Sequence, residues 1–127
     1  VNGAVWSDLD GDADSDLERV AWIEGNTKFT SHPVGKKEPN AFGLYDMHGN
    51  MWEWCQDWYE MDYYSKSPAE NPQGPSLDSG HVMRGGSWWD APKFCRAAYR
   101  NEVIPDDRLK SHYGFRVLVS VDNHSRP

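Results

Sequence analysis

The sequence predicts a small α+β domain of short strands, few helices and much ordered loop, and two features of its composition lead to this prediction. The 127 residues include 11 Gly and 8 Pro, which interrupt long helices because proline removes a backbone donor and glycine loosens the interior of an element. Seven Trp, six Tyr and four Phe provide large buried areas, although only 38% of the residues are hydrophobic. We therefore expect one compact domain over residues 1–127.

An acidic stretch dominates the first segment, residues 1–19. Residues 8–18 read DLDGDADSDLE, with Asp at every second position from 8 to 16. An EF-hand calcium loop spaces its carboxylates similarly, but Gly11 misses the position that the EF-hand turn requires, and Arg19 replaces the closing Glu. A solvated loop, a metal site and a loose chain end all remain open for this stretch.

The other predicted elements are short. We expect strands at residues 20–23, which read VAWI, around residues 51–54, and at the end of residues 113–119, which read YGFRVLV and close with the apolar run of a buried strand. Residues 26–39 and 65–79 carry the Pro, Gly and Ser punctuation of loops. The chain therefore has little regular structure between its strands.

Charge and hydropathy exclude two classes of partner. The 13 Lys plus Arg face 20 Asp plus Glu, which gives a net charge of −7. Such a surface on average repels a phosphate backbone, so we expect no nucleic-acid partner. No apolar run approaches the roughly 20 residues that span a bilayer, so we expect no membrane insertion. Nothing in the sequence indicates a cellular location.

The chain resembles the formylglycine-generating enzyme, or sulfatase-modifying factor, family. The motifs that carry the resemblance are HPVGKKEPNAFGLYDMHGNMWEWCQDWY (32–59), RGGSWW (84–89), CRAAYRNEVIPDDR (95–108) and GFRV (114–117). They cover residues 20–119 in the order of the family's C-terminal portion, followed by a polar tail at 120–127. The family's N-terminal portion is absent. The resemblance implies a variant of the C-type lectin-like fold.

Calcium is the first cofactor that the resemblance implies. In the family, the positions of Asp46 and Glu53 bind calcium through side chains, and those of Gly49 and Met51 bind it through carbonyls. Two carboxylates flanking a glycine turn also suit a hard cation on chemical grounds alone. The alternative is that Asp46 caps a turn while Glu53 pairs with an arginine.

The arginines allow two interpretations. In one they form ion pairs that fix a loop-rich domain, with acids that include Asp57 and Asp106, while Arg84 or Arg116 pairs with Glu53. In the other, some of them line a groove for an anionic or peptide ligand. The arginines concerned are Arg84, Arg96, Arg100, Arg108 and Arg116.

Copper enters only under an oxidase interpretation. Family members that oxidise a substrate cysteine bind copper(I) through two thiolates spaced as RGGSxxCxxxxC, and soft thiolates suit that ion. Here Asp90 occupies the first cysteine position, and Cys95 falls on the second. Cys95 is therefore the one candidate catalytic residue, and the pair of copper-binding cysteines is incomplete. Cys55 is either a core residue or a disulfide partner of Cys95.

The residues expected to bind a ligand lie where the family has its substrate groove and where its retroelement-diversified members vary. Aromatic residues here would anchor a ligand at low entropic cost, although Trp88 is expected to be mainly core. The candidates are Trp89, Asp90, Phe94, Arg100, Asn101, Asp106, His112 and Tyr113.

Two functions follow from these observations. The first is a calcium-stabilised module that binds a peptide, protein or sugar-like ligand and lacks the complete copper cysteine pair. The alternative is an oxidase that converts a substrate cysteine to formylglycine, or a related metal oxygenase. A homo-oligomer, or pairing with the missing N-terminal portion, is compatible with either, so the sequence leaves open whether the protein is an enzyme.

Overall fold

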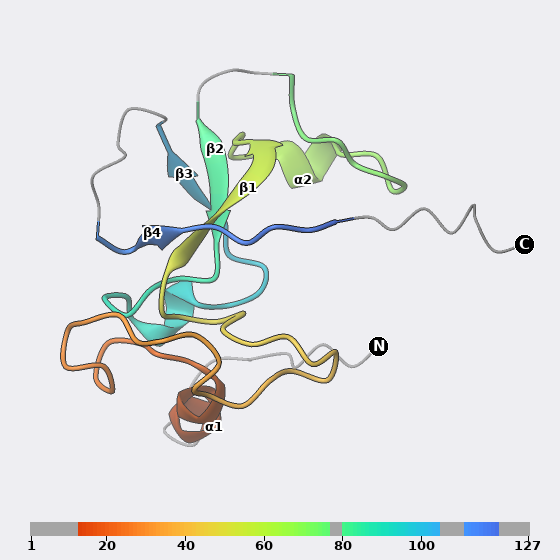
Figure 1. Ribbon diagram of the computed structural model, residues 1–127. Helices are drawn as coiled ribbons and strands as arrows, with labels where there is room; N and C mark the ends of the chain where they lie inside the picture. The colour runs from red at the N-terminus through yellow and green to blue at the C-terminus, as the bar shows by residue number, and fades with distance from the viewer. Residues whose placement is uncertain (1–12, 77–79, 105–110, 120–127) are drawn as a thin grey trace, which may run out of the picture.

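A four-stranded sheet organises the protein, for which a computed structural model describes residues 13–76, 80–104 and 111–119 (Figure 1). The strands are β1 (Trp52–Trp58), β2 (His81–Arg84), β3 (Asn101–Val103) and β4 (Tyr113–Gly114), in the order β3-β2-β1-β4. β2 pairs antiparallel with β1 and with β3, whereas β4 pairs parallel with β1. Helices α1 (Ala13–Val20) and α2 (Tyr63–Lys66) lie toward opposite ends of the molecule. This mixed sheet with few helices and long loops confirms the α+β class.

The main core lies against β1 and β2. The strand predicted around residues 51–54 is confirmed as β1, although it extends to Trp58 and shifts its register between Trp54 and Trp58. Trp52 and Met83 are 3% and 0% exposed and form a cluster with buried Val103. The partly buried side chains around this cluster are Trp54, Phe94, Tyr99 and Tyr113.

The acidic first segment corrects the sequence prediction, because residues 13–20 form helix α1 instead of a loop, a metal site or a loose end. Leu17 and Ala21 are spaced one helical turn apart, and both are buried in a second cluster with Ile23 and Cys95. Burial of this apolar face outweighs the weak helix propensity of Asp and Ser. Residues 8–12 lie outside the described part of the chain.

The strand expected at residues 20–23 is also wrong. Val20 ends α1, and Trp22 makes only an isolated parallel bridge with Gly49. The residues VAWI form the end of α1 and the segment that follows it. Ala21 and Ile23 are buried by packing in the second cluster and not by pairing in a sheet. The loop prediction for residues 26–39 is confirmed, whereas α2 takes the start of the loop expected at 65–79.

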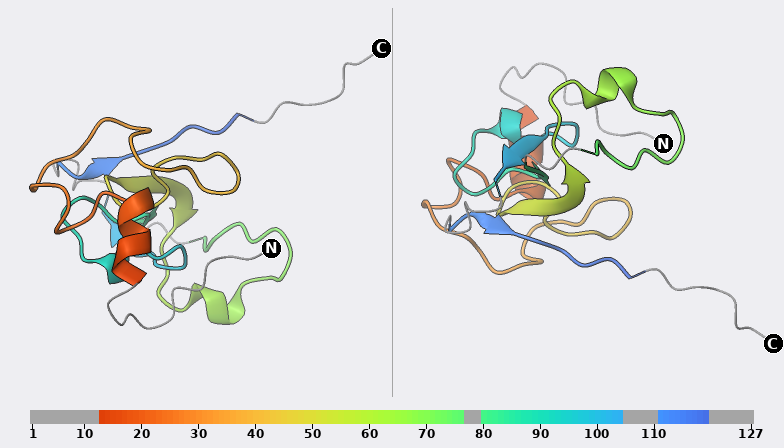
Figure 2. Two further views of the ribbon diagram at one scale, coloured as in Figure 1. Left: turned by 90° about the horizontal axis from the view of Figure 1, so that it is seen from below. Right: turned by 90° about the horizontal axis from the view of Figure 1, so that it is seen from above.

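The end of the YGFRVLV run is exposed instead of buried. β4 stops at Gly114, and Val117, Leu118 and Val119 are 84%, 89% and 82% exposed. β4 is an edge strand, and no other strand of the described residues pairs along its outer side. Figure 2 shows the chain leaving the body of the molecule after β4. The apolar run therefore has no neighbour here that covers it. Within the described residues, no helix has the length and apolar character needed to cross a membrane.

A close backbone crossing joins the segment after α1 to the turn before β1. Gly49 has a φ of +69°, and its N–H donates to the Gly85 carbonyl at 2.7 Å. The next residue, Asn50, donates its N–H to the Trp22 carbonyl at 2.6 Å. A Cβ on Gly49 would overlap the Trp22 carbonyl oxygen and lie 2.8 Å from the Trp22 carbonyl carbon, so only glycine fits this position.

We predict that Gly49→Ala costs at least about 3 kcal/mol of unfolding free energy, because it adds a backbone clash to the strain of a positive φ. Gly43→Ala is the matched control. Gly43 has a φ of +76° but open space around its Cα, so only the conformational cost of about 1–2 kcal/mol remains. Chemical denaturation of both variants measures the difference, and equal losses would contradict the crossing.

Candidate functional site

Asp90 stands at the first copper-cysteine position, and its side chain holds the local structure together. One carboxylate oxygen accepts the Trp52 indole N–H at 2.8 Å and the Ser87 backbone N–H at 3.0 Å, and it also accepts the Ser87 hydroxyl. These bonds close the RGGSWWD turn and tie it to the first residue of β1. Asp90 therefore acts here as a structural acceptor.

Cys95 is a buried thiol. It is 1% exposed, and Gly86 packs so closely against its Sγ that no side chain would fit at that glycine. Burial, assisted by the negative charge of Asp90, raises the pKa of the Cys95 thiol to about 12. Cys55 is half-buried, and burial raises the pKa of its thiol as well. Both cysteines are free, so the disulfide option does not hold in this structure.

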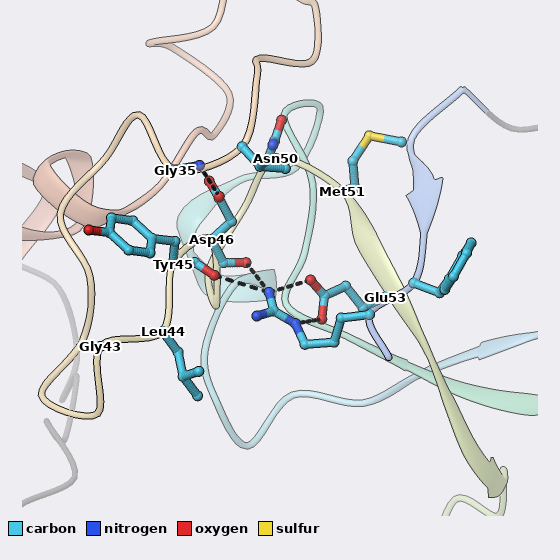
Figure 3. Close-up of a pocket in the computed structure, with 11 residues that line it drawn as sticks. Gly35, Gly43, Leu44, Tyr45, Asp46, Asn50, Met51 and Glu53 are labelled. Carbon is cyan, nitrogen blue, oxygen red and sulfur yellow. Dashed lines mark hydrogen bonds and ion pairs between the residues drawn. The ribbon is translucent and has the colours of Figure 1, made fainter. Parts of the chain in front are cut away.

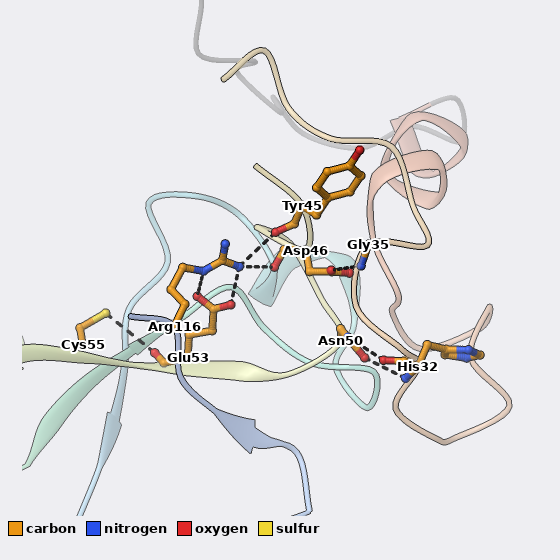
Figure 4. Close-up of polar contacts among 8 residues, drawn as sticks. All are labelled: His32, Gly35, Tyr45, Asp46, Asn50, Glu53, Cys55 and Arg116. Carbon is orange, nitrogen blue, oxygen red and sulfur yellow. Dashed lines mark hydrogen bonds and ion pairs between the residues drawn. The ribbon is translucent and has the colours of Figure 1, made fainter. Parts of the chain in front are cut away.

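Glu53 forms a two-pronged ion pair with Arg116, shown in Figure 4. Its two oxygens accept Nε and Nη2 of Arg116, each at 2.5 Å. Nη2 also donates to the carbonyls of Tyr45 and Asp46 at 3.1 and 3.2 Å. The hydrogen bond and charge of Glu53 raise the pKa of Arg116 above its usual value. Of the two arginines considered for Glu53, the structure selects Arg116.

The Asp46 carboxylate joins two loop segments of the chain. It has a φ of +54°, and its Oδ2 accepts the backbone N–H of Gly35 at 2.7 Å. Asp46, Glu53 and Arg116 line a cavity of about 400 Å³ (Figure 3). Its apolar wall includes Val34, Leu44 and Phe115. The cavity thus lies beside the DMHGNMWE turn.

The donors in this turn suit calcium in kind. No three His, Cys, Asp or Glu side chains in the described ranges gather as a metal site, so a hard cation here would need main-chain oxygens as well. Gly85 lies beside two such oxygens, because a Cβ on it would contact the Met47 carbonyl at 3.6 Å and the Met51 carbonyl at 3.9 Å. A carboxylate offers about four lone-pair positions, so Glu53 could hold Arg116 and a cation together.

A row of aromatic rings crosses the surface beside the RGGSWW turn. Ring centroids lie 5.4 Å apart for Phe29 and Trp89, 5.5 Å for Trp89 and Trp88, and 6.4 Å for Trp88 and His112. Tyr113 continues the row at 4.8 Å from His112. Trp89 and Phe29 are 57% and 61% exposed, whereas Trp88 is buried as expected. The sequence analysis missed Phe29, because no local signal links this loop residue to a tryptophan 60 positions away.

The other expected ligand-binding residues lie elsewhere. Phe94 is half-buried against the main core and meets Tyr99 edge-on at 5.3 Å. Asn101 lies in β3 opposite Met83, and Arg100 lies among the tyrosines near α2. Asp106 lies outside the described residues. The seven candidates that the structure describes therefore do not form one site, and of these Trp89, His112 and Tyr113 share the aromatic row.

The ion pairs expected for the arginines hold in part. Arg116 forms one, but no carboxylate of the described residues lies within 4.0 Å of Arg84 or Arg100. Arg84 donates to the Ala97 carbonyl instead, and Arg100 donates to the Glu60 carbonyl. Within the described part of the chain, both arginines thus donate only to neutral acceptors, and neither charge has a partner of opposite sign. Arg108 lies outside the described residues.

Comparison with known proteins places this architecture in a family. The profile of the sulfatase-modifying factor enzyme 1-like domain matches residues 5–121. The chain is 39% identical over 93 residues to the formylglycine-generating enzyme of Streptomyces coelicolor, covering 71% of this chain and 29% of that enzyme. It is 44% identical over 86 residues to the serine/threonine-protein kinase pkn1 of Chlamydia pneumoniae, covering 66% and 14%. Treponema denticola variable protein 1 superposes with a TM-score of 0.69 at 36% identity, covering 80% of this chain and 36% of that one.

The chain thus spans less than a third of that formylglycine-generating enzyme and a smaller share of the kinase. The activities of the whole relatives therefore do not follow from the match. All four motifs that carried the resemblance lie inside the matched region. On this profile match and these identities, the chain belongs to the sulfatase-modifying factor enzyme 1-like family, which includes the formylglycine-generating enzymes.

Proposed function

We propose that this chain is a binding module of its family without copper oxidase chemistry. The observation that carries the proposal is the pair of positions 90 and 95. The Asp90 carboxylate accepts hydrogen bonds from Trp52 and Ser87. The buried Cys95 thiol stays protonated because its pKa is raised. A copper(I) centre needs two accessible thiolates, so neither residue offers what the oxidase requires. Because formylglycine-generating enzymes are among the relatives, the oxidase is the competing function.

The aromatic row is the surface that would take the ligand. Exposed Trp89 and Phe29 present flat rings beside the closed turn, while Trp88 and His112 support them from behind. Such rings provide large contact areas with few rotatable bonds, which suits a peptide, protein or sugar-like ligand. We further propose that the complete domain has a C-type lectin-like fold, in which loops beside a small sheet carry the binding surface.

Calcium is the second part of the proposal. Asp46 and Glu53 would contribute side chains and Gly49 and Met51 would contribute carbonyls, with Glu53 bridging the ion and Arg116. The ion would stabilise the turn that leads into β1 and would not take part in chemistry. The support is the oxygen-only donor set and the cavity that Asp46, Met51 and Glu53 line together.

We predict that the reduced chain forms no stoichiometric copper(I) complex against a chromophoric chelator, and that Cys95→Ser gives the same result. We also expect Cys95 to react with a thiol reagent only at the rate of unfolding, because its pKa of about 12 leaves almost no thiolate near neutral pH. Cys55→Ser is the control, since it leaves Cys95 as the single thiol. Stoichiometric copper(I) that Cys95→Ser abolishes would instead support the oxidase.

We predict that calcium raises the Tm of the wild-type chain relative to EDTA. At about a hundredfold excess over Kd, binding adds about 2.7 kcal/mol to the unfolding free energy. Glu53→Gln should abolish the difference between calcium and EDTA, whereas Glu24→Gln, at an exposed acid outside the turn, should keep it. Identical melting of the wild type in calcium and in EDTA would rule out this ion.

We predict that Trp89→Ala removes most of the signal that the wild type gives on glycan and peptide arrays, because it deletes the exposed centre of the aromatic row. Phe42→Ala is the matched control. Phe42 is 81% exposed but lies outside the row, so its loss should leave array binding unchanged. Equal array patterns for Trp89→Ala and the wild type would place the ligand elsewhere.

A further inference from the structure

Two arginines face each other across β2 and β3. The antiparallel register pairs His81 with Val103, Val82 with Glu102 and Met83 with Asn101. One step further along the same register sets Arg84 opposite Arg100. Like charges at directly opposed positions of an antiparallel pair destabilise the sheet. Both side chains are nevertheless half-buried, so the fold holds two positive charges together at partial burial.

Tyr64, from α2, contacts both guanidinium groups. Its hydroxyl accepts Nη2 of Arg84 at 2.6 Å, and its ring centroid lies 4.8 Å from the guanidinium carbon of Arg100. The ring of Tyr59 lies 5.2 Å from the same carbon. The two arginines and Tyr64 thus form one cluster, which we call the arginine pair site.

The charge of this site is not balanced by the described residues. Arg19, Lys66 and Arg116 each reach a carboxylate within 4.0 Å, whereas Arg84 and Arg100 reach none in the described ranges. This arrangement is unusual in a chain of net charge −7, where acids outnumber bases. Glu53 lies opposite Arg84 in the register of β1 with β2, but its carboxylate pairs with Arg116. The guanidinium groups of Arg84 and Arg100 are therefore the charges available to attract an anion.

Hydrogen-bond donors remain available in the site. Arg84 uses Nη1 on the Ala97 carbonyl, and Arg100 uses Nη1 on the Glu60 carbonyl at 3.2 Å. No acceptor among the described residues is bonded to Nε or Nη2 of Arg100. The Tyr64 hydroxyl accepts from Arg84 and keeps its own proton to donate, and Tyr64 is 59% exposed. Guanidinium and phenol donors on one accessible cluster match the oxygens of a tetrahedral anion.

We propose that Arg84, Arg100 and Tyr64 bind a divalent oxyanion, phosphate or sulfate, either free or as the monoester group of a larger ligand. Two guanidinium charges match the charge of a dianion, and its binding relieves the repulsion between the opposed arginines. This site goes beyond the proposed function, because it requires neither the aromatic row nor any statement about copper.

In the test, the full chain is titrated with methyl phosphate, inorganic phosphate and inorganic sulfate at constant ionic strength. Binding is monitored by calorimetry and by amide chemical shifts. We expect saturable binding that Arg100→Gln weakens about tenfold or more, since it removes a charge-assisted contact. Tyr64→Phe keeps the ring and both charges and tests the site independently if Arg100→Gln does not fold; it should weaken binding by a smaller factor. Arg96→Gln removes an equal charge at an exposed position and should leave the affinity unchanged.

The pH dependence sharpens the test. Methyl phosphate should bind more tightly as its second ionisation near pH 6 completes, whereas sulfate should show no such change. Tighter binding of methyl phosphate than of inorganic phosphate identifies a monoester as the ligand, and the reverse order identifies the free ion. The proposal is overturned if no anion binds saturably, or if Arg100→Gln and Arg96→Gln bind with equal affinity. Neither result affects the copper or array measurements, so the two proposals fail separately.

Discussion

The Asp90 carboxylate is the contact on which the surroundings of the sheet depend. One oxygen receives the indole N–H of Trp52, a core residue at the start of β1, and the backbone N–H of Ser87, which is fully buried after β2. The Asp90 carbonyl accepts the N–H of Glu24 and so joins the segment after α1. Buried donors need partners, and a thiol at this position could not accept all of these bonds. The residue that holds the turn is thus the one that stands at the first cysteine position of the RGGSxxCxxxxC motif.

For stability and binding, the positions of the arginines in this molecule matter more than its net charge. Acids outnumber bases, and the exposed pairs, such as Arg19 with Glu38, contribute little because water screens them. Arg116 does more, since it crosslinks Glu53 to the carbonyls of Tyr45 and Asp46 and so fixes the turn before β1. Arg84 and Arg100 gain no such partner in the described ranges. The chain has a surplus of carboxylates but leaves these two arginines facing each other. An external anion that binds at this position would lower the free energy of the folded protein.

The sequence predicts the family, the strand β1, the loop at residues 26–39 and the pairing options of Glu53, because each depends on a motif or on local punctuation. It fails where a distant neighbour decides the outcome. Residues 13–20 are helical because Leu17 packs in a buried cluster that includes Cys95. The run after Gly114 is exposed because no described strand covers it. The aromatic row and the arginine pair site depend on contacts between distant segments and on the register of β2 with β3. Neither leaves a periodic signal in the sequence.

The short strand β4 links the exposed end of the sheet to the candidate calcium turn. Its parallel register pairs Trp52 with Tyr113 and Glu53 with Gly114, which carries Arg116 to within reach of the Glu53 carboxylate. Arg116 therefore lies between Glu53 and the apolar residues Val117, Leu118 and Val119, which point away from any described core. A change in the position of that segment would pull on Arg116 and alter the charge balance at Glu53. Under the calcium proposal, cation binding at the turn and the placement of the chain after β4 would therefore be coupled through the Arg116 guanidinium group.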